Sequence, residues 1–173
     1  MSEKIASSTE TAIQNARELL LSAEGFDSAL PKLLELLGKD LNCRWAAYWK
    51  VDSKVGVLKL ASLWNSESLN SEPLLEDSRK RRFSSGEGMV GKVWRLRKPI
   101  WSTDLVRDMS LPRSIKANSA GLVAGIWFSI ITDQTTFGVI ELLTDGALPP
   151  DDELDRILDS FGKEIGEYIE HTS

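Results

Sequence analysis

Three glycines, Gly86, Gly88 and Gly91, form the pattern GxGxxG within the stretch SSGEGMVGKVW. This spacing is the fingerprint of a dinucleotide-binding loop, in which the glycines follow a buried strand and open a helix. The residues directly before Gly86 read EDSRKRRFSS, a charged and polar segment where a buried strand is required. We therefore predict that the glycines allow a sharp turn into a short helix at 88–96, and that the chain does not bind NAD.

Cysteine and histidine are scarce, because Cys43 is the one cysteine and His171 the one histidine. This shortage excludes an intrachain disulfide and a zinc site built from several Cys and His ligands, so we expect no metal site. It also removes Ser-His-Asp and Cys-His catalysis, because His171 stands close to the end of the sequence. We predict that the chain is not an enzyme. Carboxylate chemistry by Asp104, Asp108 and Glu141 is the remaining catalytic alternative.

The composition is that of an acidic chain with a length suited to one domain: 173 residues, 42% of them hydrophobic, with a net charge of −5. Such a charge does not attract nucleic acid or anionic lipid, so we expect neither nucleic acid nor a membrane as a partner. The residues after Met1 are polar, and no run approaches the ~18 apolar residues of a membrane span. We expect a cytoplasmic protein.

Helical spacing appears at both ends of the chain, and strand-like runs lie between them. Apolar residues recur at intervals of three and four in 12–23, in 30–37 and again in 151–171. Asp27 and Gly38 suit the beginning and the end of the second helix. The β-rich runs are joined in pairs by turn residues, and these runs are 43–52, 56–65, 121–131 and 137–144. They predict two hairpins and therefore an antiparallel core sheet.

The stretch 83–144 resembles the signature half of GAF domains, which occur in bacterial sensor histidine kinases and related signalling proteins. The motifs that carry the resemblance are Gly86 and Gly88, Val93 and Trp94, Pro99 to Trp101, Asp104 and Asp108, Gly121, and Gly138 with Val139. It extends over 26–171, which we interpret as the GAF domain, after an N-terminal helix in 1–25 that serves dimerisation or linkage. The resemblance implies an α+β fold with a central antiparallel β-sheet, the terminal helices on one face and a lid-covered pocket on the other.

Strand periodicity indicates which side chains face that pocket. In 121–131, Trp127 and Ser129 share one face, while the apolar residues between them suit packing against the terminal helices. Glu141 lies in the middle of the next apolar strand, where a carboxylate needs a partner because burying it alone is costly. Arg113 is the candidate partner. We favour a structural role in which Glu141 holds a backbone or a helix in place, and contact with a ligand is the alternative.

Residues 101–118, here called the lid segment, are irregular and polar, as functional loops often are. We predict that a ligand binds between this segment and the sheet, through Trp101, Asp104, Asp108, Arg113, Asn118, Trp127, Ser129 and Glu141. Arg113 and Glu141 offer opposite charges, so we expect a zwitterionic or anionic small molecule. Trp45, Trp49, Trp64 and Trp127 are interpreted as core residues, with ligand contact as the alternative for Trp127. The basic run RKRRF at 79–83 is interpreted as a solvated loop.

The resemblance also bears on cofactors and function. Bilin-binding GAF domains use a cysteine, usually beside a histidine in the lid region, and LPRSIKANSAGL contains neither. We therefore expect no covalent bilin, and no haem because a credible ligand is missing. Methionine-sulfoxide-reducing members need several cysteines, and the single Cys43 is not enough, so we do not expect that activity. We interpret the chain as a non-catalytic small-ligand sensor or regulatory module of a signal-transduction protein, such as a two-component system, and as cofactor-free. The alternatives are a ligand-free dimerisation and signal-transmission scaffold or, less favoured, an enzyme.

The last helix carries an apolar seam at alternating steps of four and three, formed by Leu154, Leu158, Phe161, Ile165 and Tyr168. Such steps are typical of helix–helix interfaces, so we predict a homodimer through the terminal helices with this seam as its interface. The alternative is that the seam covers the sheet of a monomer.

Overall fold

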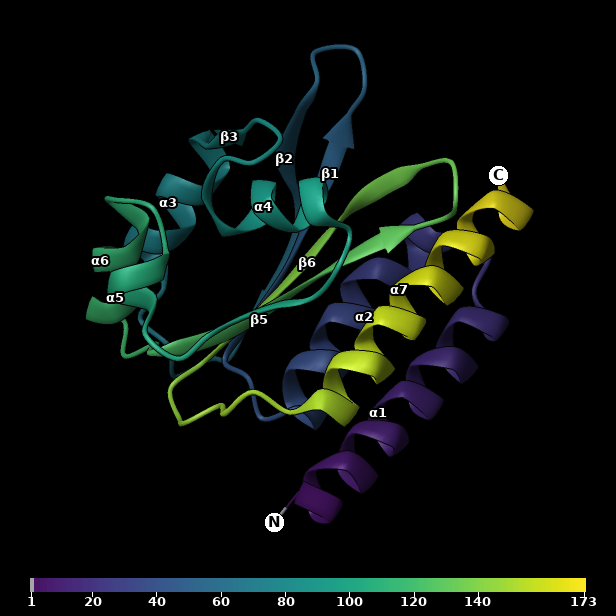
Figure 1. Ribbon diagram of the computed structural model, residues 1–173, viewed down its shortest axis with the longest axis horizontal. Coiled ribbons are helices and arrows are strands. Elements are labelled where there is room, and N and C mark those ends of the chain that lie inside the picture. The colour runs from purple at the N-terminus through teal and green to yellow at the C-terminus, as the bar shows by residue number, and fades with distance from the viewer. Residues whose placement is uncertain (1) are drawn as a thin grey trace.

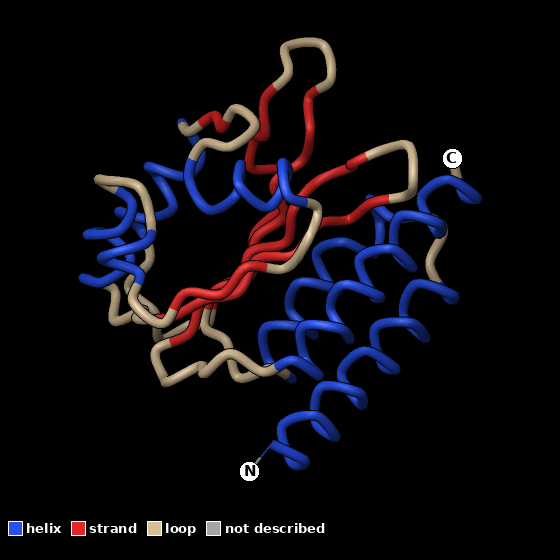
Figure 2. The backbone as a smooth tube through the Cα atoms, viewed as in Figure 1, coloured by secondary structure: helices blue, strands red, loops and turns tan. Residues whose placement is uncertain are grey.

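Six antiparallel strands form the centre of the fold. The computed structural model describes residues 2–173, and its strands lie in the order β3-β2-β1-β6-β5-β4 (Figure 1, Figure 2). Their bounds are β1 Trp45–Asp52, β2 Val57–Asn65, β3 Arg82–Phe83, β4 Ile100–Ser102, β5 Ala124–Ile131 and β6 Thr136–Thr144. Both predicted hairpins are present, and β1 pairs with β6 to join them. The predicted α+β fold with an antiparallel sheet is confirmed.

Long helices cover one face of the sheet, and short helices cover the other (Figure 1). The long ones are α1 Ser2–Ser22, α2 Phe26–Asp40 and α7 Asp152–Thr172, and the short ones are α3 Glu72–Lys80, α4 Gly88–Leu96, α5 Leu105–Asp108 and α6 Arg113–Ser119. Helices α2 and α7 pack on the sheet, and α1 packs on both of them. No helix among the described residues has the length and apolar character needed to cross a membrane.

Alternation along β5 and β6 sorts the side chains onto two faces, as predicted. Ile126, Phe128 and Ile130 are buried in the apolar cluster beneath the long helices, together with Ile140 of β6. Trp127 is buried in a second cluster beneath the short helices. The sheet therefore separates two cores, a uniformly apolar one and one rich in tryptophan.

The glycine loop serves the turn from β3 into α4, as predicted. Gly86 and Gly88 have φ angles of 86° and 62°, in the region that favours glycine. The Gly86 N–H donates to the Gly91 carbonyl at 2.8 Å, and the Ser84 N–H donates to the Glu87 carboxylate at 3.0 Å. A Cβ on Gly91 would stand 2.3 Å from the carbonyl oxygen of Ser84, so α4 packs directly against the loop.

The charged stretch before this loop is more ordered than its interpretation as a solvated loop implies. Its first residues complete α3, whose Leu74 and Ser78 are buried, and Arg82 and Phe83 form β3. Pro73 lies in the first turn of α3, where its missing N–H leaves no helical bond unmade. Helix α3 has few apolar residues, so their spacing gives little helical signal.

Helix α7 touches β5 at unusually close range. A Cβ on Gly162 would stand 2.0 Å from the carbonyl oxygen of Ser129, and a Cβ on Gly166 would stand 2.0 Å from that of Ile131. At its first turn, the Asp151 carboxylate accepts hydrogen bonds from the backbone N–H groups of Glu153 and Leu154. Helix α7 therefore packs directly on the backbone of β5 at these two glycines.

We predict that Gly162→Ala and Gly166→Ala each lower the free energy of unfolding by about 1–3 kcal/mol, because the added methyl group overpacks this contact. Glycine to alanine in an exposed helix would instead raise stability by about 1 kcal/mol. Urea unfolding followed by circular dichroism measures the difference. Glu167→Ala, an exposed change on the same helix, is the control and should stay within about 0.5 kcal/mol of the wild type. Unchanged or increased stability of both glycine variants would contradict the close contact.

Candidate functional site

A carboxylate lies buried at the centre of the sheet, on the face covered by the short helices. Glu141 of β6 is fully buried, opposite Ala47 of β1 and Trp127 of β5. Its oxygens accept hydrogen bonds from the indole N–H groups of Trp127 at 2.7 Å, Trp45 at 3.0 Å and Trp49 at 3.4 Å. Ala47 stands between the two tryptophans of β1, and its small side chain leaves room for the carboxylate.

Arg113 of α6 supplies the counter-charge. Its Nη2 atom lies 2.5 Å from Glu141 Oε1, and its Nη1 atom donates to Oε2 at 3.0 Å. The Nε–H donates to the hydroxyl of Ser78 on α3 at 2.9 Å, and the guanidinium carbon lies 5.0 Å from the centre of the Trp49 ring. The bidentate pair thus links the lid segment to the middle of the sheet.

Electrostatics keeps the Glu141 carboxylate ionised. Burial alone would raise its pKa, but the charge of Arg113, with hydrogen bonds from Arg113, Trp127 and Trp45, holds the pKa below its ordinary value. Arg113 and Glu141, the two charged residues predicted to bind a ligand, therefore pair with each other. This agrees with the prediction that Arg113 is the partner of Glu141.

The structure brings three of the predicted ligand-binding residues together and leaves others apart. Arg113, Trp127 and Glu141 form the cluster described above, and Ser129 is buried further along β5. Asn118, near the end of α6, is exposed, and the structure shows no hydrogen bond between it and this cluster. Only part of the predicted eight-residue site therefore lies together in the buried interior.

The two aspartates of the lid segment have local structural contacts. Asp104 caps α5 by accepting the backbone N–H of Arg107 at 3.2 Å. Asp108 accepts hydrogen bonds from the side chains of Arg107 and Ser102, each at 2.7 Å. The Arg107 hydrogen bond, with smaller contributions from Ser102 and Lys92, lowers the pKa of Asp108 to about 2.

Trp101 lies on the opposite face of the sheet from the predicted pocket. Strand pairing places it across from Ile126, whose side chain faces the long helices, and Trp101 packs against the same cluster. Its indole N–H donates to Asp155 of α7 at 3.2 Å. Trp101 therefore connects the beginning of the lid segment to the last helix.

Sequence reasoning overlooked the roles of Trp45, Trp49 and Ser78. The tryptophans were assigned to the core, which is where they lie, but their N–H groups also need an acceptor when buried. Their spacing of four along a strand places them on one face, and this spacing could have predicted that both indoles lie near the buried carboxylate. Ser78 gave no comparable signal, because α3 was not predicted.

The apolar seam of α7 is used within the chain. Leu154, Leu158, Phe161 and Ile165 are buried in the cluster between the long helices and the sheet, and Tyr168 packs against its edge. A dimer contact through these side chains would require them to leave that cluster.

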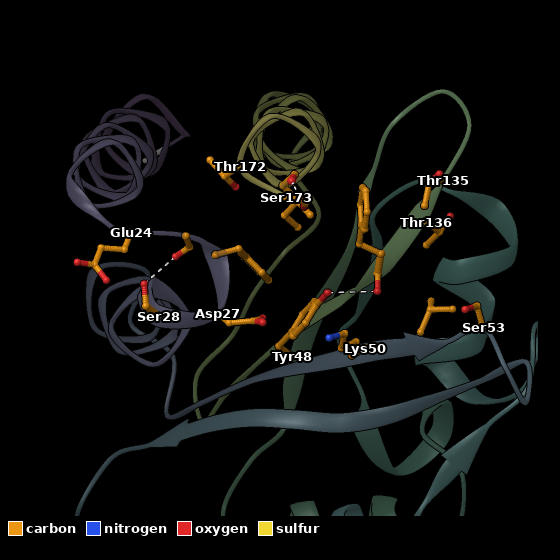
Figure 3. Close-up of a pocket in the computed structure, with 15 residues that line it drawn as sticks. Glu24, Asp27, Ser28, Tyr48, Lys50, Ser53, Thr135, Thr136, Thr172 and Ser173 are labelled. Carbon is orange, nitrogen blue, oxygen red and sulfur yellow. Dashed lines mark hydrogen bonds between the residues drawn. The ribbon is translucent and has the colours of Figure 1, made fainter.

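A separate hollow of about 690 Å³ lies on the helix side, between the start of α2, β1, the start of β6 and the end of α7 (Figure 3). The Tyr48 hydroxyl, at its wall, donates to the carbonyl oxygen of Phe137 at 3.2 Å. None of the predicted ligand-binding residues lines this hollow. The described residues include no group of three or more His, Cys, Asp or Glu placed to hold a metal ion.

Comparisons with known proteins agree with this architecture. The sequence profile of the GAF domain matches residues 23–170. Among solved structures, a free methionine-R-sulfoxide reductase from Neisseria meningitidis, in complex with its substrate, has a TM-score of 0.74 and 17% identity, covering 99% of this chain and 93% of that one. The GAF domain of a phosphoenolpyruvate-protein phosphotransferase from Coxiella burnetii has a TM-score of 0.74 and 18% identity, over 96% and 95%. The A. aeolicus nlh2 GAF domain in an inactive state has a TM-score of 0.72 and 16% identity, over 98% and 99%. No curated protein matches the chain.

These comparisons contradict the prediction that the chain is not an enzyme, because the Neisseria meningitidis protein is an enzyme of the same fold. Scarcity of Cys and His excludes particular catalytic sets, whereas it leaves other chemistry open to a domain of this fold. Cys43 itself is buried on the helix side of the sheet, and this burial raises the pKa of its thiol to about 12.

We predict that Arg113→Met lowers the free energy of unfolding at pH 7 by about 3–5 kcal/mol, because Glu141 stays buried without its counter-charge. Arg113→Met/Glu141→Gln should lose less than the single variant, because no charge then remains buried. Urea unfolding of wild type, both single variants and the double variant measures the coupling. Strictly additive losses would contradict the ion pair.

The pH dependence gives a control for this prediction. In the wild type, the lowered pKa of Glu141 contributes stability that is present above its unfolded pKa of about 4.3 and is lost as the pH falls through the folded value. In Arg113→Met the unpaired carboxyl should have a raised pKa, so the loss shrinks as the pH falls from 7 toward about 5. Parallel stability curves for the two proteins would contradict this assignment.

Proposed function

Because this chain belongs to the GAF domain family, we propose that it is a regulatory module of a signalling protein that binds a small molecule between the lid segment and the β-sheet. The observation that carries the proposal is the bidentate ion pair between Arg113 of the lid segment and Glu141 of the sheet. A buried ion pair gives little net stability over apolar packing of similar volume. Its presence beneath a set of short helices therefore favours a functional use.

The surroundings of the ion pair define the ligand class. The Arg113 guanidinium occupies a cation site made by the Glu141 carboxylate and the ring of Trp49, while the indoles of Trp45 and Trp127 hold the carboxylate in place. A ligand that enters must separate the two charges and offer each an opposite charge, because an unpaired buried charge is costly. A zwitterion, with its cationic group toward Glu141 and its anionic group toward Arg113, meets both requirements.

One further observation in this chain supports a ligand at this place. The Oγ atom of Ser114, next to Arg113 on α6, is buried and has no hydrogen-bond partner among the described residues. A buried hydroxyl normally has a partner, which a ligand or a water molecule can supply. The Neisseria meningitidis neighbour was solved in complex with its substrate, so a domain of this fold is able to bind a substrate.

The contacts of the lid segment also offer a route for the signal. Binding that displaces α6 would also displace the lid segment, which begins at Trp101. The indole N–H of Trp101 donates a hydrogen bond to Asp155 of α7. Helix α7 is in turn seated on β5 through Gly162 and Gly166. Ligand binding would therefore shift the terminal helices only if it favours one position of the lid segment over another.

A ligand-free signal-transmission scaffold is the second candidate, and complete packing of the lid side favours it. Trp45, Trp49 and Trp127 are fully buried, and Glu141 already accepts five hydrogen bonds. In that case the chain's own Arg113 would be the permanent occupant of the cation site.

We predict that zwitterions such as free amino acids and betaines, screened by thermal shift, stabilise the wild type more than Arg113→Ala or Glu141→Gln. A compound present at about 100 times its Kd adds about 2.7 kcal/mol to the folded state, and loss of either charge reduces this gain. Ser119→Ala, an exposed change at the end of α6, is the control and should respond like the wild type. Equal gains in all variants would place the site elsewhere, and no gain with any compound would favour the scaffold.

The dimer through the terminal helices remains part of the proposal, with its contact on the outer surface of α1. Leu21 of α1 is 83% exposed, whereas the seam of α7 is occupied by the core. We predict that the chain sediments as a dimer at micromolar concentration and that Leu21→Asp makes it monomeric without loss of stability. Leu111→Asp, on the lid segment, is the matched control and should leave the dimer intact. A monomeric wild type would contradict the prediction.

A further inference from the structure

Positive charge is concentrated in one segment of this acidic chain. Residues 79–98, here called the basic strip, hold eight of the 21 Lys and Arg but only one of the 26 Asp and Glu. The strip therefore carries a charge of +7, and the rest of the chain carries −12. Six of its basic side chains are exposed, namely those of Arg79, Lys80, Arg82, Lys92, Arg95 and Lys98. Such segregation creates a local field opposite in sign to the net charge.

The fold gathers the basic strip into one region. The end of α3, β3, the glycine loop and α4 lie together on the lid side of the sheet (Figure 1). The guanidinium of Arg95 lies directly against the glycine loop, because a Cβ on Gly86 would stand 2.8 Å from its Nη1 atom. The charges of α4 are thus brought next to those that precede the loop.

Acidic side chains within the domain neutralise part of this region. Asp77 pairs with Arg81 at 2.6 Å and with Lys116 of α6 at 3.1 Å, and the carboxylate of Glu87 accepts the Ser84 N–H. Lys92 is close enough to Asp108 to contribute to the lowered pKa of that carboxyl. No ion pair to a described residue is recorded for the remaining exposed cations of the strip, which are Arg79, Lys80, Arg82, Arg95 and Lys98.

A polar hollow of about 380 Å³ opens within this region. It is lined by Glu76, Asp77, Lys80, Arg81, Arg82, Glu87 and Lys116. The two salt bridges of Asp77 fix Arg81 and Lys116 at its wall, so these cations are positioned before any partner arrives. We propose that the basic strip docks an acidic segment of a partner protein, with one carboxylate of that segment received in this hollow.

An acidic protein segment fits better than a nucleic acid or a membrane. The charge of −12 outside the strip repels an extended polyanion, whereas a short peptide contacts the strip alone. Single-stranded nucleic acid needs exposed aromatic rings for stacking, but Phe83 is 2% exposed and Trp94 is half-buried against the core. Membrane insertion needs exposed apolar side chains, and Leu96 is the one large apolar side chain exposed in the strip.

The test measures binding of a fluorescent decaglutamate peptide to the whole chain by fluorescence anisotropy. Arg82→Glu/Arg95→Glu reverses two strip charges, and Lys54→Glu/Arg156→Glu is the control with the same change in net charge at exposed sites outside the strip. We expect binding at about 50 mM salt that weakens as salt is raised, about tenfold weaker binding by the strip variant, and wild-type binding by the control. Lys80→Glu/Lys98→Glu repeats the test without changing the residue that packs on Gly86, and circular dichroism confirms that each variant folds.

Equal loss in the strip and control variants would overturn the proposal, because the effect would then follow net charge alone. Absence of decaglutamate binding at low salt would overturn it as well. Tighter binding of a ten-nucleotide oligothymidylate, or of phosphatidylserine vesicles, than of decaglutamate would assign the strip to nucleic acid or to a membrane instead. Unchanged thermal-shift responses to zwitterions in the strip variants would show that this surface and the lid site act separately, which leaves the docking proposal supported by the peptide data.

Discussion

The buried carboxylate of Glu141 is the constraint on which the lid side of this domain depends. Water cannot reach it, so its counter-charge and its hydrogen-bond donors must come from the chain itself. Arg113 brings α6 to the sheet, and Ser78 brings α3 to the guanidinium. The indoles of β1 and β5 complete the set. One strand position therefore determines where two short helices dock and why three large aromatic side chains turn their N–H groups inward.

The two faces of the sheet are stabilised by different physics. Beneath the long helices, Phe128, Phe161 and their aliphatic neighbours form an apolar cluster whose stability depends on area and fit. Beneath the short helices, charge and directed hydrogen bonds select one arrangement, because an unpaired group there would be costly. The polar face is the place where a bound molecule of the right charge could compete with an internal contact.

Much of this architecture could be predicted from the sequence, and the failures have identifiable causes. Strand alternation correctly separated Trp127 from Phe128, and the cost of a lone buried carboxylate correctly pointed to Arg113 as the partner of Glu141. Trp101 was placed on the wrong face, because only its pairing with Ile126 of a distant strand determines its direction. Helix α3 escaped prediction because its stability comes from tertiary contacts more than from apolar periodicity. Catalysis was excluded too broadly, because residue scarcity limits particular mechanisms and a fold does not determine activity.

Helix α7 and strand β5 meet backbone to backbone, because Gly162 and Gly166 present no side chain to the strand carbonyls. Turning the helix about its axis, or sliding it by one residue, would drive a bulkier neighbour such as Phe161 or Ile165 into the same oxygens. Helix and strand are therefore limited to travelling together as one lever arm. Motion at the C-terminal end of α7 must then be accompanied by a displacement of β5. The movement open to this domain is therefore a tilt of β5 within the sheet, and not a rotation of α7 about its own axis.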